Sequence, residues 1–410
     1  MSDEQKRDAN TETEAGLISY HDTTAPTNGT NGGNGGDNDG DSSGLRPKPR
    51  SDIRMEGFEA HYVAPTKMPR AGLDTGRKTY TMAGYDDFDD IVDYIKKTTY
   101  TIWDLKHIGM IYRFYTPTTI VHTSDGDTFG RDTVIANSLT KMAAFPDIRD
   151  YITDVIWAGS DQEGYRTSMR WTWTARNTGY SNYGPPTGKR VVVSGMANCV
   201  IIGEQVVQEW VVYNELSLIR QLGLDIHEFL ARQSAPQPLV VGKAPATGEV
   251  NRLDGQAKPQ GYVRRNTTQG FDIEDFVRST WHEIWNERMF GNTTDHYAPH
   301  YLCHTASDRE LYGVGDLTQD IIARVAAFPD AAMHIDDLYW LDEGAGRYRV
   351  AVLWTMTGTH TGPSIYGPPT GRRARIMGIT HQIVVDGRYV EEWTEYGEFN
   401  LLKQLYAPLT

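Results

Sequence analysis

The spacing of apolar positions along the chain changes from helix-like to strand-like. Between residues 86 and 115 the apolar side chains recur near helical spacing, and a second helix is predicted after Gly130. Runs rich in β-branched and aromatic residues come next and predict four strands, at 149–158, 164–175, 189–202 and 205–213. A short helix around LSLIRQLG closes the series. Helices followed by an antiparallel meander are typical of an α+β fold.

The whole pattern occurs twice. The segment AAFPD starts at Ala143 and again at Ala326, and YGPPTG starts at Tyr183 and again at Tyr366. Both pairs are 183 residues apart, and several Trp, Glu and Gln-Leu positions match in the same register. This period is far too long for a solenoid repeat. The sequence therefore predicts two whole domains, called here the first and the second copy.

Composition divides the chain into four segments. Residues 1–83 form a tail and lead-in whose first 50 residues are rich in Gly, Asn and Asp, which predicts disorder. The first copy is assigned to 84–227 and the second to 269–410. Between them, residues 228–268 carry Pro and Gly in a spacing that interrupts regular elements, so this segment is interpreted as a linker.

Charge and cysteine content exclude several classes of protein. The formal net charge of −14 argues against a surface for nucleic acid or for anionic membranes. No run approaches 18 apolar residues, and the N-terminus lacks an apolar signal region, so a cytoplasmic protein is expected. Cys199 and Cys303 fall at different places in the two copies, which predicts neither a disulfide nor a metal site.

Seven short motifs, in the same order in each copy, resemble the SnoaL-like polyketide cyclases of the nuclear-transport-factor-two-like superfamily. They include His122 and His304, the two FPD turns, the two PPTG turns, and the endings with Trp and Gln-Leu. The second copy adds GTHTG, which contains His360. The resemblance covers about 84–226 and 271–406.

The resemblance implies two tandem cone-shaped domains. In each, helices pack on a curved antiparallel sheet around a deep, largely apolar pocket. Members of the family pair through the outer face of the sheet, so the two copies are expected to form such a pair within one chain, with further homo-oligomerisation left open. The family closes rings by aldol chemistry with a carboxylate as general acid and base. It requires no metal and no organic cofactor, so none is expected here.

The carboxylate position of the family is altered in both copies. Four residues after Trp210 stands Asn214, and four residues after Trp393 stands Gly397, neither of which exchanges a proton. Glu395 is a candidate replacement, because side chains two apart on a strand share a face. The alternative is an ordinary solvent-facing Glu.

Histidines are concentrated in the second copy. His304, His360 and His381 are candidate catalytic residues there, with a structural role as the alternative for each. Asp386-Gly387 is a strong hairpin signal. A two-residue turn at that point pairs His381 with Glu392 and places both on the face opposite Glu395.

Aromatic side chains are predicted to wall a pocket for a flat ligand, although core packing explains any single one equally well. The candidate substrate-binding residues are Trp340, Trp354, Tyr366, Trp393, His122 and Asn214.

Two functions fit these observations. The first is a cofactor-independent enzyme acting on an aromatic or polyketide-like small molecule by general acid/base proton transfer at carbon. Lyase, aldol or retro-aldol, cyclase and isomerase reactions are all of this type, and the second copy is the favoured location. The second is a non-catalytic binding or assembly module, which the loss of the family's Asp favours.

Overall fold

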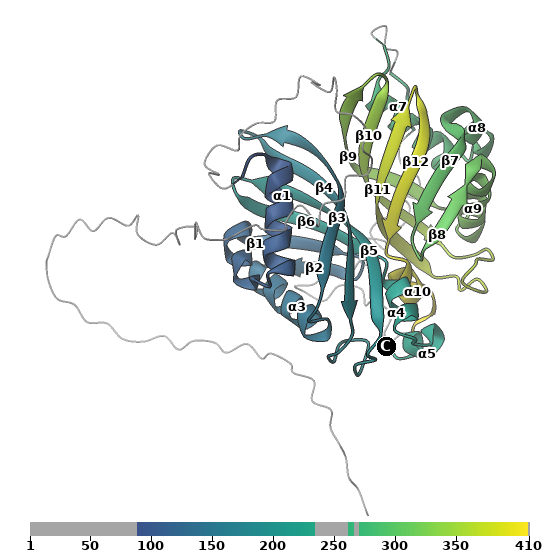
Figure 1. Cartoon of the computed structure of the whole chain (residues 1–410). Helices are drawn as coiled ribbons and strands as arrows, with labels where there is room; N and C mark the ends of the chain where they lie inside the picture. Colours follow the sequence, from purple (N-terminus) through teal and green to yellow (C-terminus); the bar gives the residue numbers. More distant parts are fainter. Residues whose placement is uncertain (1–87, 234–260, 266–269, 409–410) are drawn as a thin grey trace, which may run out of the picture. The chain divides into compact units, whose positions relative to one another are not determined.

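The computed structural model describes residues 88–233, 261–265 and 270–408. Two successive α+β units occupy these residues, and each contains a six-stranded sheet with helices (Figure 1). The predicted fold class and duplication are therefore confirmed. The predicted tail and most of the predicted linker lie outside the described residues, so the domain boundaries stay predictions.

In the first copy the elements are α1 (Ile91–Thr99), η3 (Tyr100–Asp104), η4 (Ile108–Met110), α2 (Ile111–Phe114), β1 (Tyr115–Thr123), β2 (Gly126–Phe129), α3 (Arg131–Ala144), β3 (Arg149–Ser160), β4 (Gly164–Arg176), β5 (Arg190–Ile202), β6 (Gln205–Tyr213), α4 (Glu215–Gln221) and α5 (Ile226–Ala231). The four predicted strands correspond closely to β3, β4, β5 and β6.

In the second copy the elements are α7 (Ile273–Trp281), η5 (His282–Asn286), η6 (Phe290–Asn292), α8 (Thr293–His296), β7 (Tyr297–Thr305), β8 (Arg309–Tyr312), α9 (Gly313–Ala327), β9 (Ala332–Gly344), β10 (Arg347–Thr359), β11 (Arg373–Val385), β12 (Arg388–Tyr396) and α10 (Glu398–Tyr406). Among the described residues, no helix is long and apolar enough to cross a membrane.

The first strand pair of each copy was not predicted from the sequence. The sheet order is β2-β1-β6-β5-β4-β3 in the first copy, and β1 runs parallel to β6. This pairing joins segments far apart in the sequence, so no local pattern signals it. The helix predicted over 86–115 is also divided. It begins at α1, capped by Asp90 on the amide of Asp93, and continues through a π-helical turn at η3.

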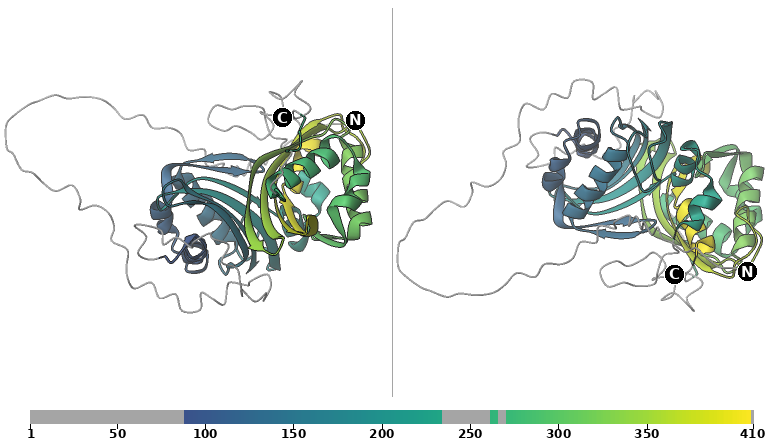
Figure 2. Two further views of the ribbon diagram at one scale, coloured as in Figure 1. Left: turned by 90° about the horizontal axis from the view of Figure 1, so that it is seen from above. Right: turned by 90° about the horizontal axis from the view of Figure 1, so that it is seen from below.

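Helices cover one face of each sheet, and the apolar core lies between these two layers (Figure 2). The opposite faces of the two sheets contact each other. Met196 and Val212 of the first copy pack against Leu353, Met377 and Ile379 of the second. Because both faces of each sheet are buried, the strands are apolar on both sides.

A buried polar cluster lies within this apolar contact. Asp154 of β3 pairs with Arg349 of β10. His381 of β11 lies between Asp154 and Ser168, with its Nδ1 at 3.3 Å from Asp154 Oδ2 and its Nε2 at 2.7 Å from Ser168 Oγ. Burial raises the pKa of Asp154, but the hydrogen bond with His381 and the charge of Arg349 together lower it to about 2. Burial lowers the pKa of His381.

Polar contacts between the copies occur in pairs related by the repeat. Arg166 and Asp337 occupy the positions equivalent to Arg349 and Asp154, and they form an ion pair of 3.0 Å in the opposite direction. Asp125, in the β1–β2 turn, accepts a hydrogen bond from Asn400 of α10 at 2.6 Å. This contact joins a turn of the first copy to the last helix of the second.

Asp308, in the β7–β8 turn, is the residue equivalent to Asp125. It accepts hydrogen bonds from Ser217 of α4 and from Asn214, the latter at 2.8 Å. Equivalent positions of the two copies thus reach across in both directions, as in the isologous interface of a twofold dimer, although the cluster around His381 has no counterpart.

The hairpin register of the second copy differs from the sequence prediction. His381 pairs with Trp393, and Gln382 pairs with Glu392. The predicted pairing of His381 with Glu392 is wrong because the register shifts by one residue between Ile383 and Val384. The shift places His381 and Glu395 on the same face.

Removing the carboxylate of Asp154 is expected to destabilise the fold. Asp154→Asn leaves His381 and Arg349 with less compensation in a buried site, which costs about 3 kcal/mol, at the low end for a broken buried pair because Glu343 still pairs with Arg349. The matched control is Asp337→Asn at the equivalent but more exposed pair, which should cost less than about 1 kcal/mol. Urea unfolding measures both, and equal losses would contradict the ranking.

Candidate functional site

Each copy encloses a cavity between its helices and the inner face of its sheet. The cavity volume is about 230 Å³ in the first copy and about 80 Å³ in the second. In the first copy Trp103 comes from the π-helical turn η3, Trp171 from β4 and Lys141 from α3. The walls are otherwise mainly apolar, as is usual for small-molecule sites.

Trp171 is placed by a glycine on the neighbouring strand. It pairs with Gly195 across β4 and β5, and a methyl group on Gly195 would lie 2.2 Å from the indole ring. The second copy repeats the arrangement with Trp354 and Gly378, where the distance would be 2.1 Å. The glycine therefore makes room for an indole lying flat along the inner wall.

Two carboxyl groups line the first cavity. Glu209 of β6 accepts a hydrogen bond from the Tyr115 hydroxyl at 3.0 Å, and burial raises its pKa to about 7. Asp150 of β3 is buried, which also raises its pKa to about 7 although Lys141 opposes the shift. Groups with pKa values near neutrality can both accept and donate protons at physiological pH.

Lys141 is the cation of the first cavity. Its Nζ lies 4.7 Å from the ring centre of Trp103, 4.9 Å from Trp173 and 5.5 Å from Trp171. Burial lowers its pKa, and Asp150 opposes that shift. No described residue forms a hydrogen bond or an ion pair within 4.0 Å with its amine.

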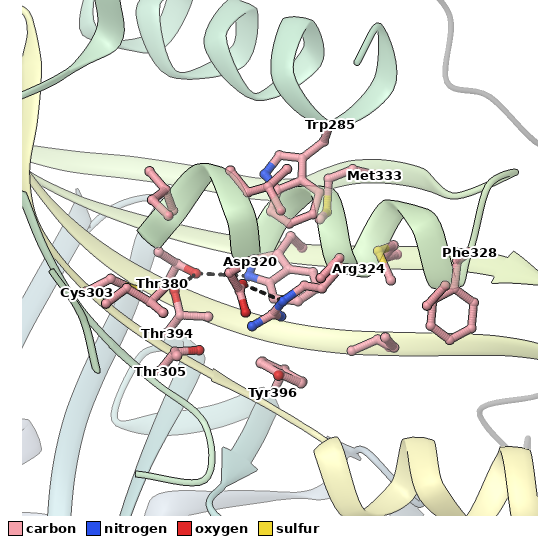
Figure 3. A pocket seen from close by; sticks show the side chains of 18 of the residues that line it. Trp285, Cys303, Thr305, Asp320, Arg324, Phe328, Met333, Thr380, Thr394 and Tyr396 are labelled. Atoms are coloured by element: carbon pink, nitrogen blue, oxygen red, sulfur yellow. Dashed lines mark hydrogen bonds and ion pairs between the residues drawn. The ribbon is translucent and has the colours of Figure 1, made fainter. Parts of the chain in front are cut away.

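The second cavity has a different distribution of charge (Figure 3). Arg324, at the position equivalent to Lys141, donates from Nε to Asp320 at 2.7 Å and lies over the ring of Tyr396. Its charge is therefore neutralised inside the cavity wall. Asp320 corresponds to Asn137, and Met333 corresponds to Asp150. The carboxylate near the cavity's cation therefore comes from strand β3 in the first copy and from helix α9 in the second.

Glu392 is the second copy's counterpart of Glu209. It accepts hydrogen bonds from Tyr301 at 2.9 Å, from Gln382 at 2.7 Å and from Thr394 at 2.7 Å. These three donors satisfy most of its acceptor capacity, and the Cys303 thiol is a fourth, weaker donor at 3.9 Å. Glu392 is thus tied into the wall, whereas Glu209 has a single donor among the described residues.

Two of the predicted substrate-binding residues line a cavity. Trp354 and Tyr366 lie on the wall of the second one. Trp340 packs against the core of that copy without lining the cavity. His360 is buried beside the cavity, 3.1 Å from Ser364, which does line it. Burial lowers the pKa of His360.

His122 and His304 lie on the sheet face that points away from the cavities. The neighbours of His304, Cys303 and Thr305, line the second cavity, and side chains alternate along a strand. His304 instead stacks on Trp393 and lies 3.0 Å from Glu310.

In the first copy His122 has the equivalent position. It stacks on Trp210 and lies 2.7 Å from Asp127.

Four further predicted residues lie at the contact between the copies. His381 and Trp393 face the first copy, Trp393 with the Arg170 guanidinium 3.7 Å from its ring centre. Asn214 caps α4 and bonds Asp308. Glu395 accepts a hydrogen bond from Ser194, and its second oxygen is buried without a partner among the described residues. The structure does not place these four side chains in either cavity.

Sequence reasoning did not place in a cavity any of the charged groups that line the two cavities, namely Lys141, Asp150, Glu209, Asp320, Arg324 and Glu392. The matching Glu-Trp pairs of the repeat were a usable signal for Glu209 and Glu392. The other four differ between the copies, so the repeat does not emphasise them. Within the described residues there is no group of three or more His, Cys, Asp or Glu side chains that could hold a metal ion.

Comparison with known proteins identifies a family. The family model described as SnoaL-like polyketide cyclase matches residues 94–222 and 276–405, which together are more than half of the chain. Among curated proteins no relative matches the chain significantly.

Several solved structures are similar to parts of the chain. A candidate polyketide cyclase from Acidithiobacillus ferrooxidans is 24% identical, with 34% of this chain and 97% of that chain covered and a TM-score of 0.29. A candidate SnoaL-like polyketide cyclase from Jannaschia sp. CCS1 is 18% identical, with 34% of this chain and 99% of that chain covered and a TM-score of 0.30. IdmH, a candidate polyketide cyclase from Streptomyces antibioticus, is 23% identical, with 33% of this chain and 99% of that chain covered and a TM-score of 0.28. These TM-scores are below 0.5, so the assignment to a family rests on the family model alone.

The protonation of Glu395 is expected to make stability depend on pH. Burial, with Asp308 and Glu398 nearby, raises its pKa from 4.5 to about 8, and only Ser194 and Arg309 oppose the shift. A raised pKa gives stability that is complete below about pH 4.5 and is lost as pH rises through 8.

Glu395→Gln removes this dependence because glutamine does not ionise. The unfolding free energy of the variant should fall less steeply than that of the wild type between pH 5 and 8, by up to about 1.4 kcal/mol per pH unit. Urea unfolding across this range measures the slopes, and parallel curves would show that Glu395 is ionised in the folded protein.

Adding a methyl group behind the first cavity is expected to displace its indole. Gly195→Ala forces Trp171 away from the sheet and should cost about 1–3 kcal/mol. The control is Gly109→Ala, where nothing lies within 4 Å of the new methyl group. Urea unfolding with near-ultraviolet circular dichroism measures stability and indole packing. An unchanged spectrum for Gly195→Ala would refute the predicted displacement.

Proposed function

Because the chain belongs to the SnoaL-like polyketide cyclase family, we propose that it is an enzyme that transfers protons at carbon on an aromatic or polyketide-like carbonyl compound. The reaction is of the aldol, retro-aldol, cyclase or isomerase type. The first copy is the proposed location. One observation carries this choice: the first cavity contains two carboxyl groups, Glu209 and Asp150, whose pKa values are both raised to about 7.

Glu209 is the proposed general base. Its carboxyl lies in a desolvated wall, and the Tyr115 hydroxyl at 3.0 Å orients it. Desolvation brings its pKa close to the working pH, which favours proton abstraction from a weakly acidic carbon. This step generates an enolate from a carbonyl compound bound between the aromatic walls.

Asp150 is the proposed general acid. It is buried at the start of β3, and its protonated form gives a proton to the oxygen on which negative charge develops. Lys141 lies in the same cavity and adds positive charge. These groups supply the acid and base functions that Asn214 and Gly397 cannot supply.

The second copy is proposed to bind a small molecule without catalysing its reaction. Its cation is neutralised by Asp320, and Glu392 is held by three donors. This reverses the preference for the second copy drawn from the sequence, which rested on His304, His360 and His381.

A non-catalytic role for the whole chain is the second candidate function. Its supporting observation is that the family's acid position serves structural contacts in both copies. Asn214 caps α4 and bonds Asp308, and Gly397 precedes α10 and packs against Ser124.

Loss of the proposed base is expected to abolish exchange at carbon. Aryl methyl ketones incubated with the protein in heavy water should gain deuterium at the carbon next to the carbonyl. Glu209→Gln should lower the rate about 100-fold or more, the usual contribution of a general base. The matched control, Glu392→Gln at the equivalent position of the second copy, should retain the rate.

The rate should have a narrow maximum near pH 7. It rises as Glu209 ionises and falls as Asp150 loses its proton, since both pKa values are about 7. Asp150→Asn should remove the alkaline fall and lower the maximum. Loss of exchange in Glu392→Gln but not in Glu209→Gln would move the site to the second copy. Ligand binding without exchange in any protein would favour the binding module.

A further inference from the structure

We propose that Lys141 is a nucleophilic amine that forms a Schiff base with the carbonyl group of the substrate in the first cavity. The inference rests on the proposed function, because it assigns the covalent step that precedes proton transfer by Glu209. It extends the acid/base chemistry to amine catalysis and restricts the substrate to an aldehyde or a ketone.

The position of Lys141 fits this role. It lies in the last turn of α3, and its side chain reaches the cavity over the faces of Trp103, Trp171 and Trp173. The amine has no hydrogen bond and no ion pair within 4.0 Å to a described residue. It is therefore held in place by ring contacts while its nitrogen remains available to a ligand.

Competing effects set the charge of this amine. The three indole faces favour the ammonium form, and burial favours the neutral amine. The neighbouring charged groups are Asp150 on β3, which raises the pKa of Lys141, and Lys106 after η3, which lowers it. The net effect lowers the pKa of Lys141, which increases the fraction of neutral amine that can attack a carbonyl carbon.

Two comparisons within the chain distinguish Lys141 from other positively charged side chains. At the equivalent position the second copy has Arg324, whose guanidinium is paired with Asp320 and does not form an imine. Lys106 is half-buried, but its amine donates hydrogen bonds to the carbonyl oxygens of Trp103 and Ile148 and does not line the cavity. Among these positively charged side chains, Lys141 combines an amine, an open cavity and no fixed partner.

The chemical steps balance with groups already in the cavity. The neutral amine attacks the carbonyl carbon, and the electron pair of the C=O bond moves to oxygen. That oxygen leaves as water with one proton from the amine and one from Asp150, which produces a protonated imine and an Asp150 carboxylate.

The protonated imine withdraws electrons from the adjacent carbon, so Glu209 removes a proton there, or a carbon–carbon bond breaks, to give an enamine. The enamine is then reprotonated to the imine. Addition of one water molecule, equal to the one released earlier, restores the amine and frees the carbonyl product.

Two probes test the covalent step on the full chain. 1-Phenylbutane-1,3-dione should form a conjugated enaminone with the wild type, seen as a new near-ultraviolet absorption. Benzaldehyde followed by sodium borohydride should leave a benzyl group on one lysine, which peptide mass spectrometry should locate at Lys141. Lys141→Arg and Lys141→Met should lower both signals at least 10-fold, whereas Lys106→Arg should retain them.

Deuterium exchange into an aryl ketone, measured beside the trapping, separates this proposal from the proposed function. Absence of both adducts in the wild type, or adducts on another lysine, overturns the Schiff base. Exchange by folded Lys141→Arg within about twofold of the wild type also overturns it, since arginine keeps the charge but forms no imine. If exchange still depends on Glu209 in those cases, the proposed function stands. Adducts at Lys141 with loss of exchange in both lysine variants support the covalent step.

Discussion

Burial of both faces of each sheet is the constraint on which the rest of the structure depends. In each copy one face of the sheet covers a cavity and the other face packs against the other copy, so a polar group on either face loses water and must find a partner. Asp154 meets this requirement through Arg349 and His381. Glu395 has one oxygen without a partner among the described residues. Burial therefore favours its neutral, protonated form and raises its pKa to about 8. The same loss of water produces the raised pKa values of Glu209 and Asp150 in the first cavity.

The positions at which the family resemblance implies an acid serve contacts between the copies. In a twofold pair of identical chains one substitution alters both sites together, whereas a duplicated chain varies each site separately. Here Asn214 and Gly397 have become part of the reciprocal contact at the starts of α4 and α10. The turns carrying Asp125 and Asp308 reach across to these helices. Asn214 caps its helix, and Gly397 lies so close to Ser124 that a larger residue would collide with it.

The fold was largely predictable from the sequence because its signals are local or repeated. Strands β3 to β6 follow from continuous β-branched runs, and the copies follow from the matching segments. The parallel pairing of β1 with β6 was not predictable, since it joins residues about 90 positions apart. The candidate site was predicted poorly for a related reason. His381 and Glu395 were placed by counting along a regular hairpin, and a single register shift changed which face each occupies relative to the other.

The two cavities show that the same wall position acquires its chemistry from its neighbours. Glu209 and Glu392 occupy equivalent places on β6 and β12. Glu392 has three donors, which replace most of the water it loses, whereas Glu209 has only Tyr115 among the described residues and remains poorly compensated. Poor compensation costs stability, but it also keeps the carboxyl near its midpoint of ionisation, where a general base is most effective. Under the proposed function, the first copy keeps this energetically unfavourable arrangement for proton transfer, whereas the three donors around Glu392 remove it from the second copy.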